Sequence, residues 1–153
     1  PFSVVPVIAG EVTSSRGWRA YDDHDGLEYW AAEMREAGIR TAVFVDPDPA
    51  SVELAAACTI EAVEIYTGDY AAAHERGDYA EALDAIEQAA ETARALGLRL
   101  NGGHDLTIRN LGPLCSRVQF DEFSIGHHIA TDALVRGLSD AVTDFKSAVP
   151  ERV

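Results

Sequence analysis

Two short segments of this chain place a histidine directly after glycine. In the segment LNGGHD two glycines precede His104, and in the segment GHH Gly126 precedes His127. An imidazole titrates near neutral pH and can transfer protons there. A backbone N–H beside a residue without a Cβ atom can approach an anion such as a phosphate. His104 is therefore a candidate for proton transfer, and Gly126 and His127 are candidates for phosphate binding. The alternative for both segments is an ordinary turn whose histidine forms a local hydrogen bond.

The order of strand-like and helix-like segments predicts how these residues are positioned. Short apolar, β-branched runs alternate with longer segments in which apolar residues recur at helical spacing. Strands separated by helices pair in parallel with right-handed crossovers, so the sequence predicts an α/β fold. Strands are predicted at Ser3–Val7, Thr41–Val45, Ala62–Tyr66, 98–101 and Glu122–Ile125, helices over 24–37, 50–57, 78–96, 107–115 and 130–147, and a loop at Thr67–Tyr70.

A parallel sheet gathers the carboxyl ends of its strands at one edge, where binding sites lie. Both glycine–histidine segments follow a predicted strand, so we expect His104 and His127 on the same rim. Asp46 also follows a predicted strand, and it is either a cap of the next helix or a pocket residue. In the first helix, the spacing of Leu27 and Trp30 predicts that both side chains face the core.

Composition limits the class of protein. The 153 residues include 26 acidic and 12 basic side chains, and the formal net charge of −14 argues against nonspecific binding to nucleic acid or to an anionic membrane. The length fits one domain, residues 1–153, and the apolar stretches are too short to span a bilayer. No secretory signal is visible, and Cys58 and Cys115 lack metal or redox spacing, so we expect reduced thiols in the cytoplasm. The histidines likewise lack metal-ligand spacing, and we expect no metal site.

Five segments of the chain resemble successive segments of the pyridoxine 5'-phosphate synthase family. They are VVPVIAGEVTSSRG, GIRTAVFVDPDP, AVEIYTGDYA, ALGLRLNGGHDLTIRNL and EFSIGHHIATDALVRGLSDAV. In the family's order, they resemble the patterns V-P-E-x-x-x-E-V-T-T-E-G-G, F-I-D-x-D, E-x-H-T-G-x-Y-A, N-A-G-H-G-L and N-I-G-H. Glu11, Val12 and Thr13 are in register with the first pattern. The resemblance covers essentially the whole chain.

The resemblance implies a (β/α)8 TIM barrel, of which this chain matches strands four to eight, a partial barrel of about five parallel strands. It implies the condensation of 1-deoxy-D-xylulose 5-phosphate with 3-amino-2-oxopropyl phosphate in vitamin B6 biosynthesis, with release of phosphate and water and without a cofactor. His104 matches the family's proton donor. Asp105, Gly126 and His127 match positions that hold substrate, largely its phosphate. Glu64 also matches a family Glu, and since a carboxylate inside a barrel must be paired or functional, we place it in the barrel interior.

Several positions depart from the family's pattern. Asp105 stands where the family has Gly, and a carboxylate ~4 Å from a phosphate would repel it by roughly 1–4 kcal/mol. Tyr66 replaces a His, Ser124 replaces an Asn, and Val7 replaces a Glu. The family's N-x-D-H-V and H-x-R-E-D segments do not occur among these residues, and its general bases, a His and a Glu, belong to that missing half. We therefore expect a synthase-like domain that is incomplete for catalysis alone. The alternative is a non-catalytic phosphate-ligand-binding or structural module derived from the barrel.

Five parallel strands cannot close a barrel of eight. The first and last strands would each leave an unpaired edge, and such edges promote association. We expect the chain to form an oligomer, which is a dimer of this chain, or to assemble with a complementary N-terminal half. The alternatives are an open, doubly wound sheet and a longer chain of which this sequence is a part. Its small-molecule partners are expected to be phosphorylated substrates.

Overall fold

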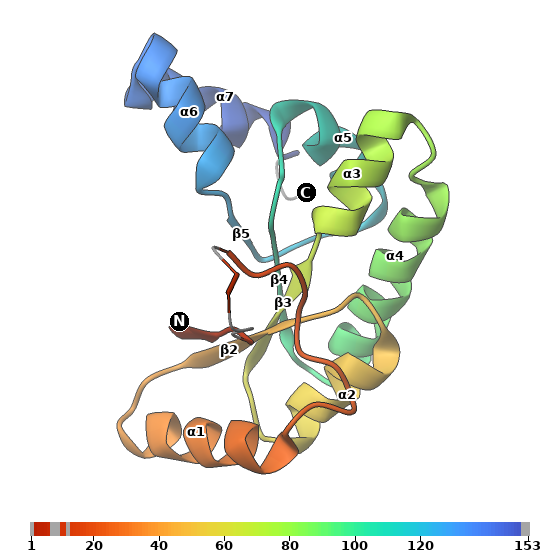
Figure 1. Cartoon of the computed structure of the whole chain (residues 1–153), viewed down its shortest axis with the longest axis vertical. Helices are drawn as coiled ribbons and strands as arrows, with labels where there is room; N and C mark the ends of the chain where they lie inside the picture. Colours follow the sequence, from red (N-terminus) through yellow and green to blue (C-terminus); the bar gives the residue numbers. More distant parts are fainter. Residues whose placement is uncertain (1, 7–9, 12, 151–153) are drawn as a thin grey trace.

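The computed structural model describes residues 2–6, 10–11 and 13–150, and a parallel sheet of five strands forms its centre (Figure 1). The strands pair in the order β1-β2-β3-β4-β5, and every pair is parallel. This arrangement confirms the predicted α/β class. The strands are β1 (Phe2–Val4), β2 (Thr41–Val45), β3 (Ala62–Tyr66), β4 (Arg99–Gly103) and β5 (Glu122–Ser124).

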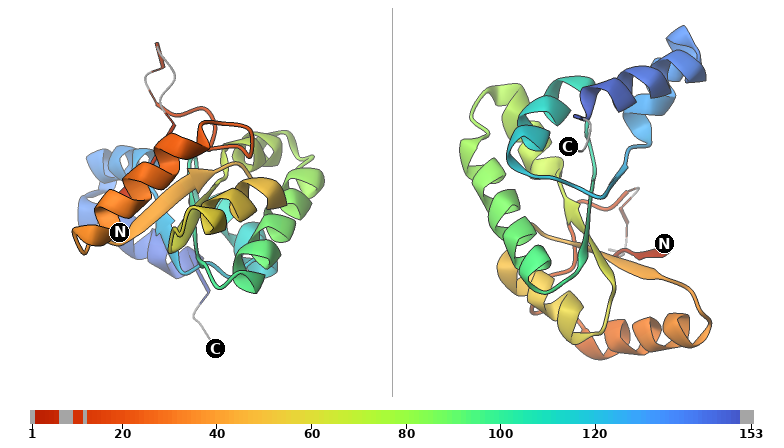
Figure 2. Two further views of the ribbon diagram at one scale, coloured as in Figure 1. Left: turned by 90° about the horizontal axis from the view of Figure 1, so that it is seen from below. Right: turned by 180° about the vertical axis from the view of Figure 1, so that it is seen from behind.

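Each connection between neighbouring strands contains at least one helix, and the helices surround the outer side of a curled sheet (Figures 1 and 2). Consecutive strands are neighbours throughout, so right-handed crossovers place all helices on one face and curve the sheet into a partial barrel, here called the half-barrel. The doubly wound alternative is wrong, because its strand order would reverse. The helices are α1 (His24–Glu36), α2 (Pro49–Ala57), α3 (Gly68–Arg76), α4 (Ala80–Ala95), α5 (Ile108–Arg117), α6 (His127–Arg136) and α7 (Leu138–Ala148).

Alternation along the strands separates an apolar outer face from a more polar inner face. On β3, Val63 and Ile65 belong to the core beneath the helices. Glu64 lies between them and therefore points to the inner face. Its register partners, Phe44 on β2 and Asn101 on β4, continue the same row across the sheet. The hydrophobic core thus lies between sheet and helices, and polar groups line the concave side.

Capping residues fix where the chain turns from a strand end into the next helix. Asp48 caps α2, because its carboxylate accepts hydrogen bonds from the N–H of Ser51 at 2.9 Å and from its hydroxyl at 2.6 Å. Thr107 and Asn110 form a capping box at the start of α5. These caps hold the connections that follow β2 and β4, and the connection after β4 carries His104.

Two helix predictions are wrong. The residues predicted as a loop, Thr67–Tyr70, lie mostly inside α3, which begins directly after β3 and buries Tyr70. The alanine run after Tyr70 favours a helix at this place, and the prediction overlooked it. The predicted helix over 130–147 is divided into α6 and α7 at Gly137, whose φ of 93° and ψ of 150° interrupt the helix and suit only glycine.

Several strand ends, including that of β5 at Ser124, and one helix face also differ from prediction. β1 is described at Phe2–Val4, whereas Val7 of the predicted first strand lies outside the described residues. β4 continues beyond residue 101 through Gly103. On α1, Leu27 is buried as predicted, but Trp30 is 52% exposed.

Both ends of the half-barrel expose apolar side chains. In the described residues, β1 and β5 each pair with one neighbour, and Phe2 on β1 is 53% exposed. At the other end, Leu134 and Val135 on α6 and Leu138 on α7 are 88%, 85% and 64% exposed; these three residues are called the α6–α7 patch. Exposed apolar side chains of this size are uncommon on a monomer when they form one patch.

Among the described residues, no helix has both the length and the apolar character needed to cross a bilayer.

Candidate functional site

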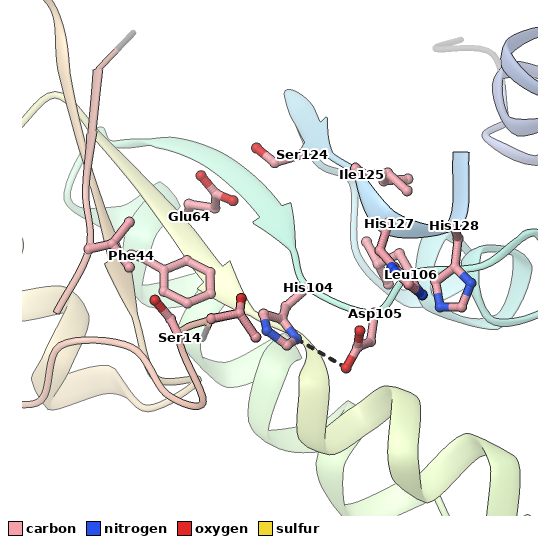
Figure 3. A pocket seen from close by; sticks show the side chains of 13 residues that line it. Ser14, Phe44, Glu64, His104, Asp105, Leu106, Ser124, Ile125, His127 and His128 are labelled. Carbon is pink, nitrogen blue, oxygen red and sulfur yellow. Dashed lines mark ion pairs between the residues drawn. The ribbon is translucent and has the colours of Figure 1, made fainter. Parts of the chain in front are cut away.

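The residues selected from the sequence line one cavity of about 640 Å³ at the carboxyl ends of the strands (Figure 3). Its walls come from the β4–α5 and β5–α6 connections, from the inner faces of β2 and β3, and from the segment that follows β1. All five candidate residues therefore meet around one space. The lining residues are Val5, Thr13, Ser14, Phe44, Glu64, His104, Asp105, Leu106, Ser124, Ile125, Gly126, His127 and His128.

Glu64 reaches the cavity from the middle of β3. It is 8% exposed, and its Oε2 atom accepts a hydrogen bond of 2.9 Å from the hydroxyl of Ser3 on β1. Because β2 lies between β1 and β3, this bond passes across β2, where Ser3 is in register with Ala42. A carboxylate at this depth needs such a partner. The structure places Glu64 on the inner face of the half-barrel, with its second oxygen towards β4.

Protein atoms fill the space beside the two glycines of the LNGGHD segment, so these glycines make room for neighbouring side chains. A Cβ atom at Gly103 would lie less than 3.0 Å from Oε1 of Glu64. A Cβ atom at Gly102 would lie 2.8 Å from the ring of Phe120. Gly126 differs, because no described atom lies within 4 Å of the position its Cβ would take. An incoming ligand can therefore approach the backbone at Gly126.

His104 and Asp105 form a left-handed turn at the end of β4. Their φ angles of 93° and 54° are uncommon for residues other than glycine. The hydroxyl of the fully buried Thr67 lies 2.7 Å from the carbonyl oxygen of Gly103 and 2.6 Å from that of His104. Asn110 donates its side-chain amide to the carbonyl oxygen of Asp105 at 3.2 Å. These contacts hold a strained turn in place, as is common at functional sites.

The left-handed turn brings together two side chains that an extended strand would send to opposite faces. Oδ2 of Asp105 lies 3.1 Å from Nδ1 of His104 (Figure 3). The imidazole also packs edge-on against the ring of Tyr66, with 5.0 Å between centroids, and lies 6.4 Å from the ring of Phe44. Aromatic rings and a carboxylate thus restrict the orientation of His104.

Residue 66 is Tyr in this chain, whereas the family that the chain resembles has His at this position. Burial raises the pKa of Tyr66, and the nearby carboxylates of Asp69 and Asp105 add to the effect. The phenol therefore stays protonated at neutral pH. A Cβ atom at Gly68 would lie less than 3.0 Å from the phenol oxygen, so the glycine at the start of α3 makes room for this ring.

Helix α6 begins at the cavity. Gly126 is its N-cap residue, and in the described residues no side chain caps its first turn. His127 and His128 occupy that turn, with their rings in edge-to-face contact at 5.1 Å. First-turn N–H groups have no helical acceptor and carry partial positive charge. An anion in the cavity can therefore accept hydrogen bonds from this ten-residue helix.

The segment between β1 and α1 forms one wall of the cavity, and the sequence reasoning did not assign its residues to the site. Thr13 and Ser14 contribute hydroxyl-bearing side chains to the lining. Behind them, the N–H of Trp18 donates to the carbonyl oxygen of Phe44 at 2.7 Å, and Trp18 forms a parallel bridge with Val45. The register of Thr13 with the E-V-T-T-E-G-G pattern is the signal that could have pointed to this wall.

Asp46 holds that segment in place. Its carboxylate accepts a hydrogen bond of 2.7 Å from the N–H of Gly17 and another from Nε of Arg19. Arg16 and Asp22 form an ion pair at 2.6 Å within the same segment, and this hydrogen-bonded pair lowers the pKa of Asp22. Asp46 neither caps α2 nor lines the cavity, so both alternatives for it are wrong.

The charged groups of the cavity are carboxylates and imidazoles. None of the described lining residues is Lys or Arg, whereas Glu64 and Asp105 contribute acids and His104, His127 and His128 contribute imidazoles. In the described part of the chain, no group of three His, Cys, Asp or Glu residues is arranged to hold a metal ion. Binding of an anion would therefore depend on the N-terminus of α6 and on protonated histidines, unless another polypeptide supplies cations.

Comparison with known proteins matches the chain to one family and to one kind of fold. The family described as "Pyridoxal phosphate biosynthesis protein PdxJ" matches residues 2–151. Pyridoxine 5'-phosphate synthase of Brucella anthropi is 41% identical over 151 residues, covering 96% of this chain and 61% of that protein. The synthase of Bacteroides fragilis is 39% identical over 148 residues, covering 96% and 62%. The chain thus spans about 61% of the length of these curated relatives.

The fold is also shared with a solved structure. The HMG-CoA lyase of Brucella melitensis superimposes with a TM-score of 0.56 at 22% identity, covering 82% of this chain and 48% of that one. At this identity the likeness concerns the arrangement of strands and helices alone.

Proposed function

Because the chain belongs to the family of the pyridoxal phosphate biosynthesis protein PdxJ, we propose that it is the strand-four-to-strand-eight part of a pyridoxine 5'-phosphate synthase. The observation that carries the proposal is the meeting of His104, Glu64, Gly126 and His127 around one cavity at the carboxyl ends of the strands. These residues come from three strands or strand ends that lie far apart in the sequence. Barrels of this kind carry their chemistry at that rim.

The proposed reaction condenses 1-deoxy-D-xylulose 5-phosphate with 3-amino-2-oxopropyl phosphate, with release of phosphate and water. His104 would transfer a proton, since its ring lines the cavity and is held by Tyr66 and Phe44. A substrate phosphate would bind at the start of α6, where Gly126 leaves the backbone open and no side chain in the described residues caps the first turn. His127 stands beside that phosphate, and Asp105 borders the substrate on the β4 side.

A second polypeptide segment would complete the site. The half-barrel has five strands, and the curated relatives are longer than the matched region by more than a third of their length. Three further βα units would close an eight-stranded barrel. They would cover Phe2 and the α6–α7 patch, and they would supply the positive charge that the cavity lacks. A second copy of this chain is the other polypeptide that could cover Phe2 and the α6–α7 patch.

We expect little synthase activity from this chain alone, because loss of one member of an acid–base pair typically costs about 10²–10⁴-fold in rate. The test measures pyridoxine 5'-phosphate formation from both substrates, first with the chain alone and then with the N-terminal segment of the Brucella anthropi synthase added. Activity in the mixture that His104→Gln abolishes would support the proposal. Full activity from the chain alone would contradict the assignment of the general bases to another segment.

The absence of Lys and Arg from the described cavity lining favours one second candidate, a non-catalytic module derived from the barrel. Glu64 and Asp105 place two carboxylates beside the space that a phosphate would occupy. Titration with inorganic phosphate separates the candidates. If the mixture is inactive but still binds phosphate, the chain is a module that binds phosphorylated ligands. If the mixture is inactive and binds no phosphate, the chain is a purely structural module.

A further inference from the structure

We propose that Asp105 is a positioning residue for His104: its carboxylate accepts the Nδ1–H of the imidazole and leaves Nε2 as the basic nitrogen that faces the cavity. Oδ2 of Asp105 lies 3.1 Å from Nδ1, which is within the distance range of an N–H···O hydrogen bond. Figure 3 shows the other ring nitrogen on the side away from Asp105, towards Ser14. The assignment concerns the tautomer and orientation of one ring.

The backbone creates this pair. Two consecutive residues other than glycine adopt positive φ, and this left-handed turn places neighbouring side chains on the same side. Thr67 and Asn110 hold the carbonyl oxygens of the turn with buried or partly buried hydrogen bonds. A backbone strained at two positions persists only when its surroundings stabilise it. The backbone of the turn therefore brings Asp105 next to His104.

The burial of Nδ1 gives the second argument. Nδ1 of His104 is buried, and in the described residues it has no well-aligned hydrogen bond. A buried ring nitrogen without a partner is costly. The side chain of Asp105 is 52% exposed and can rotate, whereas that of His104 is 19% exposed. A hydrogen bond to Nδ1 therefore requires a rotation of the Asp105 carboxylate. The rings of Tyr66 and Phe44 lie beside His104, with 5.0 Å and 6.4 Å between ring centroids.

The pair has a chemical consequence, and this part rests on the proposed function. A neutral imidazole that carries its proton on Nδ1 presents the lone pair of Nε2 to the cavity. As a proton donor, His104 would therefore give up a proton from Nε2 only after that nitrogen has taken one up, with Asp105 stabilising the imidazolium. The carboxylate also repels a phosphate on the β4 side, which favours phosphate binding at the start of α6.

The test uses the full chain with ¹⁵N-labelled histidine and reads the tautomer of His104 from its ring-nitrogen chemical shifts, at a pH where the imidazoles are neutral. His104→Gln assigns the signals. We expect the Nδ1–H form to predominate in the wild type, to decrease in Asp105→Asn, whose amide oxygen is a weaker acceptor, and to give way to the Nε2–H form in Asp105→Gly. Asp140→Asn, an exposed carboxylate on α7, is the matched control and should change nothing.

Asp105→Asn and Asp105→Gly are both expected to fold, because asparagine and glycine adopt positive φ more readily than other residues do. The signals of His24 and His74 report on the rest of the fold. A wild-type His104 in the Nε2–H form, or the same tautomer in wild type and Asp105→Gly, would overturn the proposal. The readout needs no substrate, so inactivity of the mixture with the N-terminal segment would refute the proposed function and leave this pair unaffected.

Discussion

The carboxylate of Glu64 occupies the space that a side chain at residue 103 would need. Gly103 on β4 is in register with Tyr66, two residues after Glu64 on β3, and the missing Cβ atom leaves room for Oε1 of Glu64. The glycine therefore serves the protein's own buried acid, which is anchored on its other oxygen by Ser3. Both residues lie just below the rim that carries His104.

Substitution of Gly103 by alanine should displace Glu64. The new methyl group overlaps Oε1 and presses on the carbonyl oxygen of Ser124 at 3.1 Å, so we expect a loss of about 1–3 kcal/mol in the free energy of unfolding. Denaturant unfolding of Gly103→Ala, Glu64→Ala and the double variant measures the coupling. The double variant should be more stable than the sum of the single losses predicts. Strict additivity would show that Glu64 is not what the methyl group meets.

Removal of the Thr67 hydroxyl should loosen the turn that carries His104. Thr67→Val keeps the shape of the side chain but leaves the carbonyl oxygen of His104 without this donor, at an expected cost of about 1–3 kcal/mol in unfolding free energy. Thr143→Val is the matched control, because Thr143 also donates to a carbonyl oxygen but lies on the exposed surface of α7. Equal effects of the two substitutions would argue against a special role for the buried hydroxyl.

Polar substitutions in the α6–α7 patch should weaken association. Leu134→Gln and Leu138→Gln remove exposed apolar area that we expect a second segment or copy to cover. Sedimentation velocity of the chain, alone and mixed with the N-terminal segment, should show a shift towards the smaller species. Leu96→Gln, at the end of α4 and away from the patch, is the control and should leave the distribution unchanged. A wild-type chain that is monomeric in both conditions would contradict the expected cover.

Stability should fall at alkaline pH through Tyr70. Burial is the main reason that its pKa is raised from 10.0 to about 12, and its hydroxyl donates to the carbonyl oxygen of Asn110 at 2.6 Å. The folded state therefore favours the neutral phenol, and this contribution is fully present below pH 10 and is lost between pH 10 and about 12, up to about 3 kcal/mol in all.

The variant Tyr70→Phe tests this dependence. Its unfolding free energy should be about 1 kcal/mol lower than that of the wild type at neutral pH, because the hydrogen bond is gone. Its decline above pH 10 should be shallower, with the remaining slope coming from groups such as Tyr66, whose pKa burial also raises. Parallel curves for the two proteins across this range would show that Tyr70 does not cause the alkaline loss.

Local patterns were enough to predict the sheet. The β-branched runs at Thr41–Val45 and Ala62–Tyr66 form strands with the predicted bounds, because a strand buried by helices must be apolar. Strict alternation of strands and helices then left parallel pairing as the simplest topology. The predicted loop at Thr67–Tyr70 failed because a glycine and a short polar stretch at a strand end resemble a turn until the packing of Tyr70 is known.

For the site, residue types and the resemblance to the family identified the candidates but not their relations. The sequence named His104, Asp105, Gly126, His127 and Glu64, and parallel topology explained why they share one rim. It could not tell that Gly103 accommodates a buried carboxylate, because that space depends on a neighbouring strand.

Three-dimensional packing alone decided the rest. Asp46 fixes the segment before α1 because the chain returns to the end of β2 at Trp18, a contact between residues far apart in sequence. The nearness of Asp105 to His104 follows from two backbone angles that residue identity does not reveal, since neither residue is glycine. Periodicity and residue type act through near neighbours along the chain, whereas buried hydrogen bonds and strained turns are selected by contacts that exist only after the sheet has formed.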